Sequence, residues 1–190
     1  MKQTEIVFLL DRSGSMGGFE SDTIGGFNSF IQRQCELEGE TRLTTVLFDD
    51  EYEILWDGVE ATQVKLTDKE YYVRGMTALL DAVGKTILTV GNRISTLGKR
   101  KPDQVIFVIT TDGMENASKE FTYKTVKKLI RQKTNEGWEF IFMGANIDVN
   151  EEAEHIGVSV ENAYSFDVSE KGVESMYERV FEAVAERRKS

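Results

Sequence analysis

Long apolar runs that alternate with helix-period segments are the feature that most constrains the fold of this chain. The runs lie at residues 5–10, 44–48, 104–110 and 138–144, with a weaker fifth at 162–166. Runs without polar alternation are typical of strands buried on both faces of a sheet. Apolar residues at helical spacing lie between them, first at 24–31 and 79–94 and later at 121–136 and 172–188.

Strands that alternate with helices predict a parallel sheet covered by helices on both faces. The stretch LFDDEYEILW contains a short turn at 49–51, which allows one antiparallel edge strand. We therefore expect an α/β fold with a doubly wound, Rossmann-like central sheet that is mostly parallel and has one antiparallel edge strand. The 190 residues, 40% of them hydrophobic, suit a single domain over 1–190.

The net charge excludes some classes of binding partner, and the cysteine content indicates the cellular compartment. The 23 basic and 33 acidic residues leave a net charge of -10, which repels nucleic acid and anionic membranes. Cys35 is the only cysteine, so no internal disulfide can form, and the chain fits a reducing compartment. The first apolar run is too short for a signal peptide or a membrane span. We expect a cytoplasmic protein that binds neither nucleic acid nor membrane.

Polar side chains follow the first strand, in the stretch IVFLLDRSGSMGG at 6–18, where Asp11, Ser13 and Ser15 lie close together. If strands 5–10 and 104–110 are neighbours, the DRSGS and TDGMEN segments leave adjacent strand ends, where ligands bind in such sheets. Thr77, in RGMTALLDAV, lies just ahead of the second helix and can face the same crevice. Asp112 completes a set of five oxygen-bearing side chains.

This set has no histidine and no cysteine, and hard oxygen ligands suit Mg²⁺ or Mn²⁺, or less well Ca²⁺, rather than zinc. Two carboxylates and three hydroxyls leave room for a further anionic oxygen on the ion. Each residue also has an ordinary alternative role, because aspartate, serine and threonine cap helices and turns. Their predicted convergence at one sheet edge favours metal binding.

The pattern D-x-S-x-S after a first strand, a distant threonine and T-D-G after a central strand resembles the metal-ion-dependent adhesion site (MIDAS) of von Willebrand factor type A domains. VITTDGMENAS, EGWEFIFMGANIDV and AEHIGV extend the resemblance to stand-alone bacterial members of that family. The family frequently has two glycines before the threonine, whereas Met76 precedes it here.

The resemblance implies that Ser13, Ser15 and Thr77 ligate the ion directly or through water, and that Asp11 and Asp112 act largely through water. A Glu or Asp of a protein partner would complete the coordination. Family members also work beside ATPases, so an ATPase-containing complex is one implied setting. On this interpretation the chain is a metal-dependent binding module and not an enzyme.

The main enzymatic alternative is a serine hydrolase that uses Ser13, Asp112 and His155, which follow the chain order of α/β-hydrolases. Ser13 lacks the preceding glycine of a nucleophile elbow, which weighs against it. VGKT at 83–86 lacks the first glycine of a P-loop, and no G-x-G-x-x-G is present. A phosphatase with Asp11 as nucleophile lacks an acid two residues on.

Three of the six methionines, Met16, Met76 and Met114, each lie within two residues of a candidate ligand, on three different loops. They could pack the loops together, or they could form a soft apolar rim that contacts a partner. The second interpretation predicts that at least two of the three side chains are solvent-accessible.

Overall fold

A six-stranded sheet in the order β3-β2-β1-β4-β5-β6 forms the centre of the computed structural model, which describes residues 1–190. The strands are β1 (Gln3–Asp11), β2 (Glu40–Phe48), β3 (Tyr52–Glu60), β4 (Gln104–Thr111), β5 (Glu139–Gly144) and β6 (Ala163–Ser165). All neighbouring strands are parallel except β2 and β3, which are antiparallel. The predicted fold class is confirmed, including the antiparallel edge strand.

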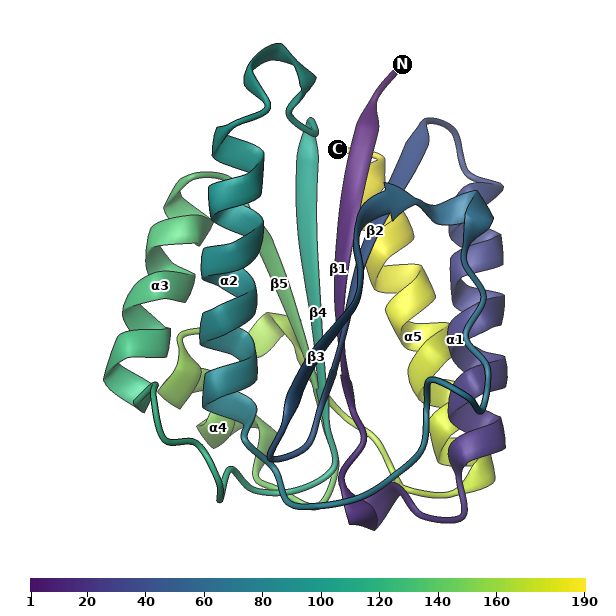
Figure 1. The fold of residues 1–190 in the computed structure, drawn as a ribbon, viewed down its shortest axis with the longest axis vertical. Coiled ribbons are helices and arrows are strands. Elements are labelled where there is room, and N and C mark those ends of the chain that lie inside the picture. Colours follow the sequence, from purple (N-terminus) through teal and green to yellow (C-terminus); the bar gives the residue numbers. More distant parts are fainter.

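Helices cover both faces of this sheet (Figure 1). One face is covered by α1 (Glu20–Cys35) and α5 (Glu170–Arg188), and the other by α2 (Leu79–Ser95), α3 (Tyr123–Asn135) and α4 (Val149–Ile156). Short 3₁₀ turns connect several elements: η1 (Gly14–Met16), η2 (Ala61–Gln63), η3 (Gly98–Arg100) and η4 (Val160–Asn162). None of the helices combines the length and the apolar character that crossing a membrane requires.

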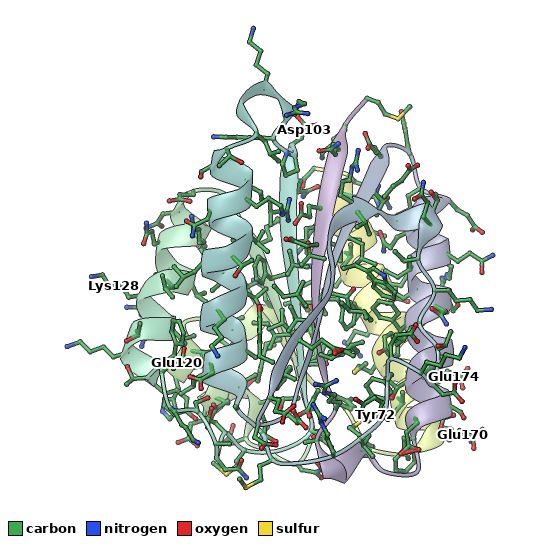
Figure 2. The ribbon with its side chains drawn as sticks, in the orientation of Figure 1. Tyr72, Asp103, Glu120, Lys128, Glu170 and Glu174 are labelled. Carbon is green, nitrogen blue, oxygen red and sulfur yellow. The ribbon has the colours of Figure 1, made fainter.

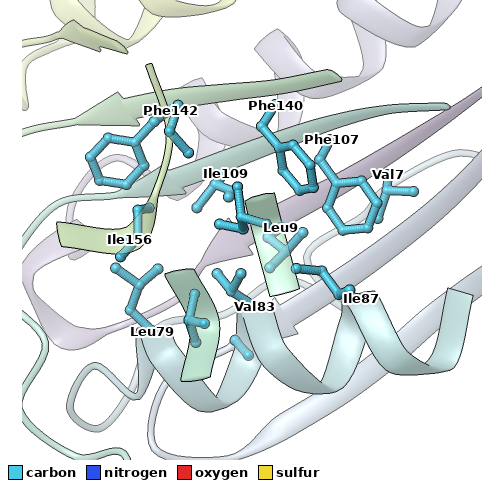
Figure 3. Packing of buried hydrophobic residues seen from close by; sticks show 14 of the residues in the cluster. Val7, Leu9, Leu79, Val83, Ile87, Phe107, Ile109, Phe140, Phe142 and Ile156 are labelled. Atoms are coloured by element: carbon cyan, nitrogen blue, oxygen red, sulfur yellow. The ribbon is translucent and has the colours of Figure 1, made fainter. Parts of the chain in front are cut away.

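The burial of strand β1 on both faces explains why apolar and polar residues do not alternate along it. Ile6 and Phe8 face the core under α1 and α5, whereas Val7 and Leu9 face the core under α2, α3 and α4, and all four side chains are fully buried. Figure 3 shows the second of these cores, in which Val7 and Leu9 pack with side chains of α2, β4 and β5. A strand with apolar neighbours on both faces has no solvent side for polar residues.

The structure extends the predicted first strand and adds one helix. Gln3 and Thr4 continue β1 because they pair with Glu40 and Thr41 of β2. Helix α4 was not predicted from periodicity, since it has only eight residues; Asp148 caps its start by accepting a hydrogen bond from the Glu151 N–H.

The two central strands send their following helices to opposite faces of the sheet. After β1 the chain passes to α1, whereas after β4 it passes to α3 on the other face (Figure 1). In an open α/β sheet, the usual place for a ligand is beyond the carboxyl ends of the strands where such a divergence occurs, here β1 and β4. Because β1 and β4 are neighbours, as predicted, their two polar loops meet there.

Close packing between α1 and α5 gives a test of this fold. A Cβ added at Gly26 would overlap the ring of Tyr177, whereas a Cβ at the adjacent Gly25 would meet nothing within 4 Å. We expect Gly26→Ala to lower the free energy of unfolding by about 1–3 kcal/mol through overpacking. Gly25→Ala should raise it by about 0.5–1 kcal/mol, because alanine favours a helix over glycine. Urea unfolding of both variants measures this, and equal effects would contradict the packing.

Candidate metal centre

The carboxylate of Asp11 joins the ends of the two central strands. One oxygen, Oδ1, accepts a hydrogen bond from the Ser13 N–H at 2.7 Å. The other, Oδ2, accepts from the Asp112 N–H at 3.1 Å and from the Thr111 hydroxyl at 3.0 Å. Asp11 therefore fixes the backbone of the loop after β1 against the backbone of the loop after β4.

The Ser13 hydroxyl links the Asp112 carboxylate to the Ser15 hydroxyl. It donates to Asp112 Oδ1 at 2.9 Å and lies 3.2 Å from the Ser15 hydroxyl oxygen. Asp11, Ser13 and Asp112 are at most 4% exposed, whereas Ser15 is exposed. The cluster therefore lies below the surface and opens to solvent beside Ser15.

Thr77 is held at the same edge through its backbone. Its N–H donates to the Asn116 side chain at 2.9 Å, and its carbonyl accepts from the Asn116 N–H, also at 2.9 Å. On the other side, the Gly14 N–H donates to the Gly75 carbonyl at 3.2 Å. The loop that carries Thr77 thus contacts both polar loops. Ala78, not Thr77, occupies the cap position of α2, so the capping role weighed for Thr77 is not observed.

A charged cluster that the sequence did not single out fixes this third loop. Asp49 follows β2 directly, whereas Asp11 is the last residue of β1. The buried Asp49 carboxylate accepts from Arg74 Nε at 2.9 Å and lies 3.8 Å from Arg12 Nε. The Asp49 carbonyl accepts from the Ala78 N–H at 2.8 Å, and the Arg12 carbonyl from the Arg74 N–H at 2.9 Å. Gly75 passes this turn with φ of 64°, where a side chain would collide with Asp50.

The carboxyl groups of Asp11 and Asp112 are buried close together, so a bound cation would offset the repulsion between them. Burial, and then repulsion from Asp112, raise the pKa of the Asp11 carboxyl from 3.8 to about 7. Burial also raises the pKa of the Tyr71 phenol, which stays protonated and donates to the Asp11 carbonyl at 2.9 Å. No arginine or lysine forms an ion pair with Asp11 or Asp112, since the nearby Arg12 pairs with Asp49 and Glu53.

The donor atoms present fit a hard divalent ion. Asp112 Oδ2 is buried and has no hydrogen-bond partner within the chain, which is costly for a carboxylate oxygen unless a cation or water contacts it. Nowhere do three or more His, Cys, Asp or Glu side chains gather as a possible metal site. The carboxylates of Asp11 and Asp112 thus depend on hydroxyls to complete a ligand set, and such a set suits Mg²⁺ or Mn²⁺.

His155 is not part of this centre. It is exposed in the last turn of α4, where its ring packs edge-on against Tyr123 at a centroid distance of 5.7 Å. The Ser13 hydroxyl donates to Asp112 and has no imidazole to receive its proton. A serine hydrolase using Ser13, Asp112 and His155 is therefore not supported, because a nucleophilic serine needs its base within hydrogen-bond reach.

The three methionines near the centre differ in exposure. Met16 is 6% exposed and packs inward from η1, whereas Met76 and Met114 are 54% and 65% exposed. The prediction that at least two of them are accessible is confirmed, and the expectation that Met16 belongs to an exposed rim is wrong. Met16 is buried because η1 turns it toward the core, where it borders a small cavity together with Met176 of α5.

Comparisons with known proteins agree with this architecture. The family model for the von Willebrand factor type A domain matches residues 5–179. No curated protein sequence matches the chain.

Several solved structures are similar in fold. The proximal thread matrix protein 1 from the mussel byssus, with a zinc-occupied MIDAS motif, has a TM-score of 0.68 at 15% identity over 96% of this chain and 46% of that chain. The vWF domain of the type V pili tip protein Mfa5 from Porphyromonas gingivalis has a TM-score of 0.70 at 10% identity, over 97% and 95%. Manganese-loaded TRAP protein from Plasmodium vivax has a TM-score of 0.58 at 19% identity, over 80% and 60%. The chain spans less than half of the mussel protein.

The raised pKa of Asp11 predicts how pH changes the stability of the metal-free protein. Unfolded Asp11 loses its proton near pH 3.8, whereas the folded residue keeps it until about pH 7. The folded state binds more protons between these values, so this residue makes the free energy of unfolding fall as pH rises from about 4 to about 7.

The variant Asp11→Asn lacks this titration. We expect its free energy of unfolding, measured in urea with a chelator present, to rise relative to the natural protein between pH 4.5 and pH 7.5. The cost of changing the acceptor for Asp112 N–H is the same at each pH, so it does not affect this slope. A difference that stays constant with pH would show that Asp11 is ionised throughout.

Proposed function

The chain belongs to the von Willebrand factor type A family, and from that premise we propose that it is a protein-binding module that depends on a divalent metal ion. The observation that carries the proposal is the buried pair Asp11 and Asp112, without a cationic partner and open to solvent beside Ser15. Zinc at the MIDAS of the mussel protein and manganese in the Plasmodium protein support a divalent ion in this fold.

We assign the ligand set to Asp11, Ser13, Ser15, Thr77 and Asp112, and the ion to Mg²⁺ or Mn²⁺. When bound, the ion supplies a Lewis-acid position for a carboxylate oxygen from a Glu or Asp of a protein partner. Asp11 presets the loops, because its two oxygens hold the N–H groups of Ser13 and Asp112. Ser15 lies at the solvent side, where a partner would approach.

The proposal describes binding without a chemical reaction, so it assigns no catalytic residue. It places the chain in the cytoplasm, with which a single cysteine is consistent. We also propose that the chain is of the stand-alone bacterial type within this family. An ATPase-containing complex is then one candidate source of its protein partner.

Metal binding itself gives a direct test. A ligand at about 100 times its dissociation constant stabilises a protein by about 2.7 kcal/mol if it binds only the folded state. We therefore expect Mg²⁺ or Mn²⁺ to raise the Tm of chelator-treated protein by several degrees. Ser13→Ala should lose most of this rise, whereas Ser29→Ala, which changes an exposed serine of α1, should keep it.

Titration calorimetry on these two variants and on Asp112→Ala separates metal binding from folding. Asp112→Ala should abolish metal binding and leave the metal-free fold intact or slightly more stable, because it removes a buried carboxylate that repels Asp11. No Tm rise in millimolar metal would contradict the proposal. An Asp112→Ala variant that unfolds, yet binds metal in its folded fraction, would make the aspartate structural.

A further inference from the structure

We propose that Tyr72, Met76 and Met114 form a contact surface beside the candidate metal centre, called the apolar rim below. The rim favours a partner segment in which the metal-bound carboxylate lies next to a large apolar side chain. This inference rests on the proposed function, because it describes which carboxylate-bearing segment that centre selects.

Exposed large apolar side chains are few, and three of them lie in the loops at this edge of the sheet. Only seven such side chains in the chain are exposed: Met1, Ile54, Tyr72, Met76, Leu88, Met114 and Val160. Three of the seven belong to the loops that carry Thr77 and Asp112. Tyr72, Met76 and Met114 are 45%, 54% and 65% exposed, so they offer apolar surface that the fold itself does not cover.

Backbone contacts place the two methionines close to each other. Thr77 and Asn116 exchange two hydrogen bonds of 2.9 Å, one through the Asn116 side chain. Met76 directly precedes the first of these residues, and Met114 lies two residues before the second. The Met76 N–H is itself held, since it donates to Asp50 Oδ1 at 3.2 Å. The Met76 backbone is therefore held directly, and Met114 lies close to the Thr77–Asn116 bonds, while the flexible thioether side chains of both can adapt to a partner.

Tyr72 is a more rigid part of the rim. Its ring lies 5.7 Å from the guanidinium carbon of Arg12 and 5.6 Å from that of Arg74. Arg12 is buried, and both arginines are anchored by Asp49. Figure 2 shows Tyr72 at the end of the molecule opposite Asp103, which precedes β4. Because cation–π contacts hold this exposed aromatic ring in place, the ring loses little side-chain freedom when a partner binds.

The negative charge of this chain limits how many acidic residues the partner segment can carry. The chain carries a net charge of -10, and Asp50 and Glu51 lie exposed on the turn beside the rim. A segment with many acidic residues would be repelled, whereas a single carboxylate can be bound by the metal ion while its neighbours contact apolar surface. Since an ion alone does not distinguish one carboxylate from another, the surface around it must supply the selectivity.

Peptide binding to the Mg²⁺-loaded full chain, followed by NMR chemical shifts, tests this inference. The probes are acetyl-Leu-Glu-Leu-amide, acetyl-Ser-Glu-Ser-amide and acetyl-Leu-Gln-Leu-amide. We expect the leucine–glutamate peptide to bind about tenfold more tightly than the serine–glutamate peptide, as partial burial of two leucines predicts. The glutamine peptide should bind much more weakly than either.

Paired variants assign the preference to the rim. The double variant Met76→Ser, Met114→Ser should lower the preference to less than about twofold without changing the Mg²⁺ affinity. The matched control Leu88→Ser, Val160→Ser changes two exposed apolar residues elsewhere and should keep the full preference.

Two kinds of failure can be told apart. If both glutamate peptides bind equally, or if the rim variant keeps the preference, the apolar rim is refuted while metal-dependent carboxylate binding stands. If no glutamate peptide binds to protein that holds Mg²⁺, or if the glutamine peptide binds as tightly, the proposed function itself is refuted, and the inference with it.

Discussion

Two buried carboxylates of like charge at the ends of neighbouring strands are the constraint on which the centre depends. Asp11 and Asp112 come together because β1 and β4 are adjacent and parallel, so their carboxyl ends reach the same sheet edge. Burial and mutual repulsion make it costly for both to be ionised, as the raised pKa of Asp11 shows. The rest of the fold holds the two carboxyl groups together, and a bound divalent cation would offset the repulsion between them.

The third loop is fixed by contacts on two sides. On one side Asp49 anchors Arg74 and, through its carbonyl, Ala78. On the other, Glu115 accepts from the Leu80 N–H at 3.1 Å, and Asp81 accepts from three N–H groups of residues 119–121 at 2.8–3.0 Å. The first bond satisfies a backbone N–H at the start of α2, and all four bonds together pin the loop after β4 to that helix. Thr77 lies between the two sets of contacts.

Much of this arrangement could be predicted from the sequence because it follows from local patterns. Apolar runs without alternation predicted the buried strands, and the strand-end rule placed Asp11 and Asp112 at one edge. Helix α4 was too short to show a period, and the inward direction of Met16 depends on η1, which no pattern indicates. The Asp49 cluster was missed because ion pairs between distant loops are tertiary, although Asp49 also follows a strand.

The central claim is that five side chains at this edge hold a divalent ion. Anomalous diffraction at the manganese edge from crystals soaked in Mn²⁺ tests it most directly, because it locates the ion without reference to a partner. The account predicts one strong peak within about 2–2.5 Å of the Ser13 and Ser15 hydroxyl oxygens, with Asp112 beside it. A strong peak elsewhere, or none here at millimolar Mn²⁺, would contradict the account.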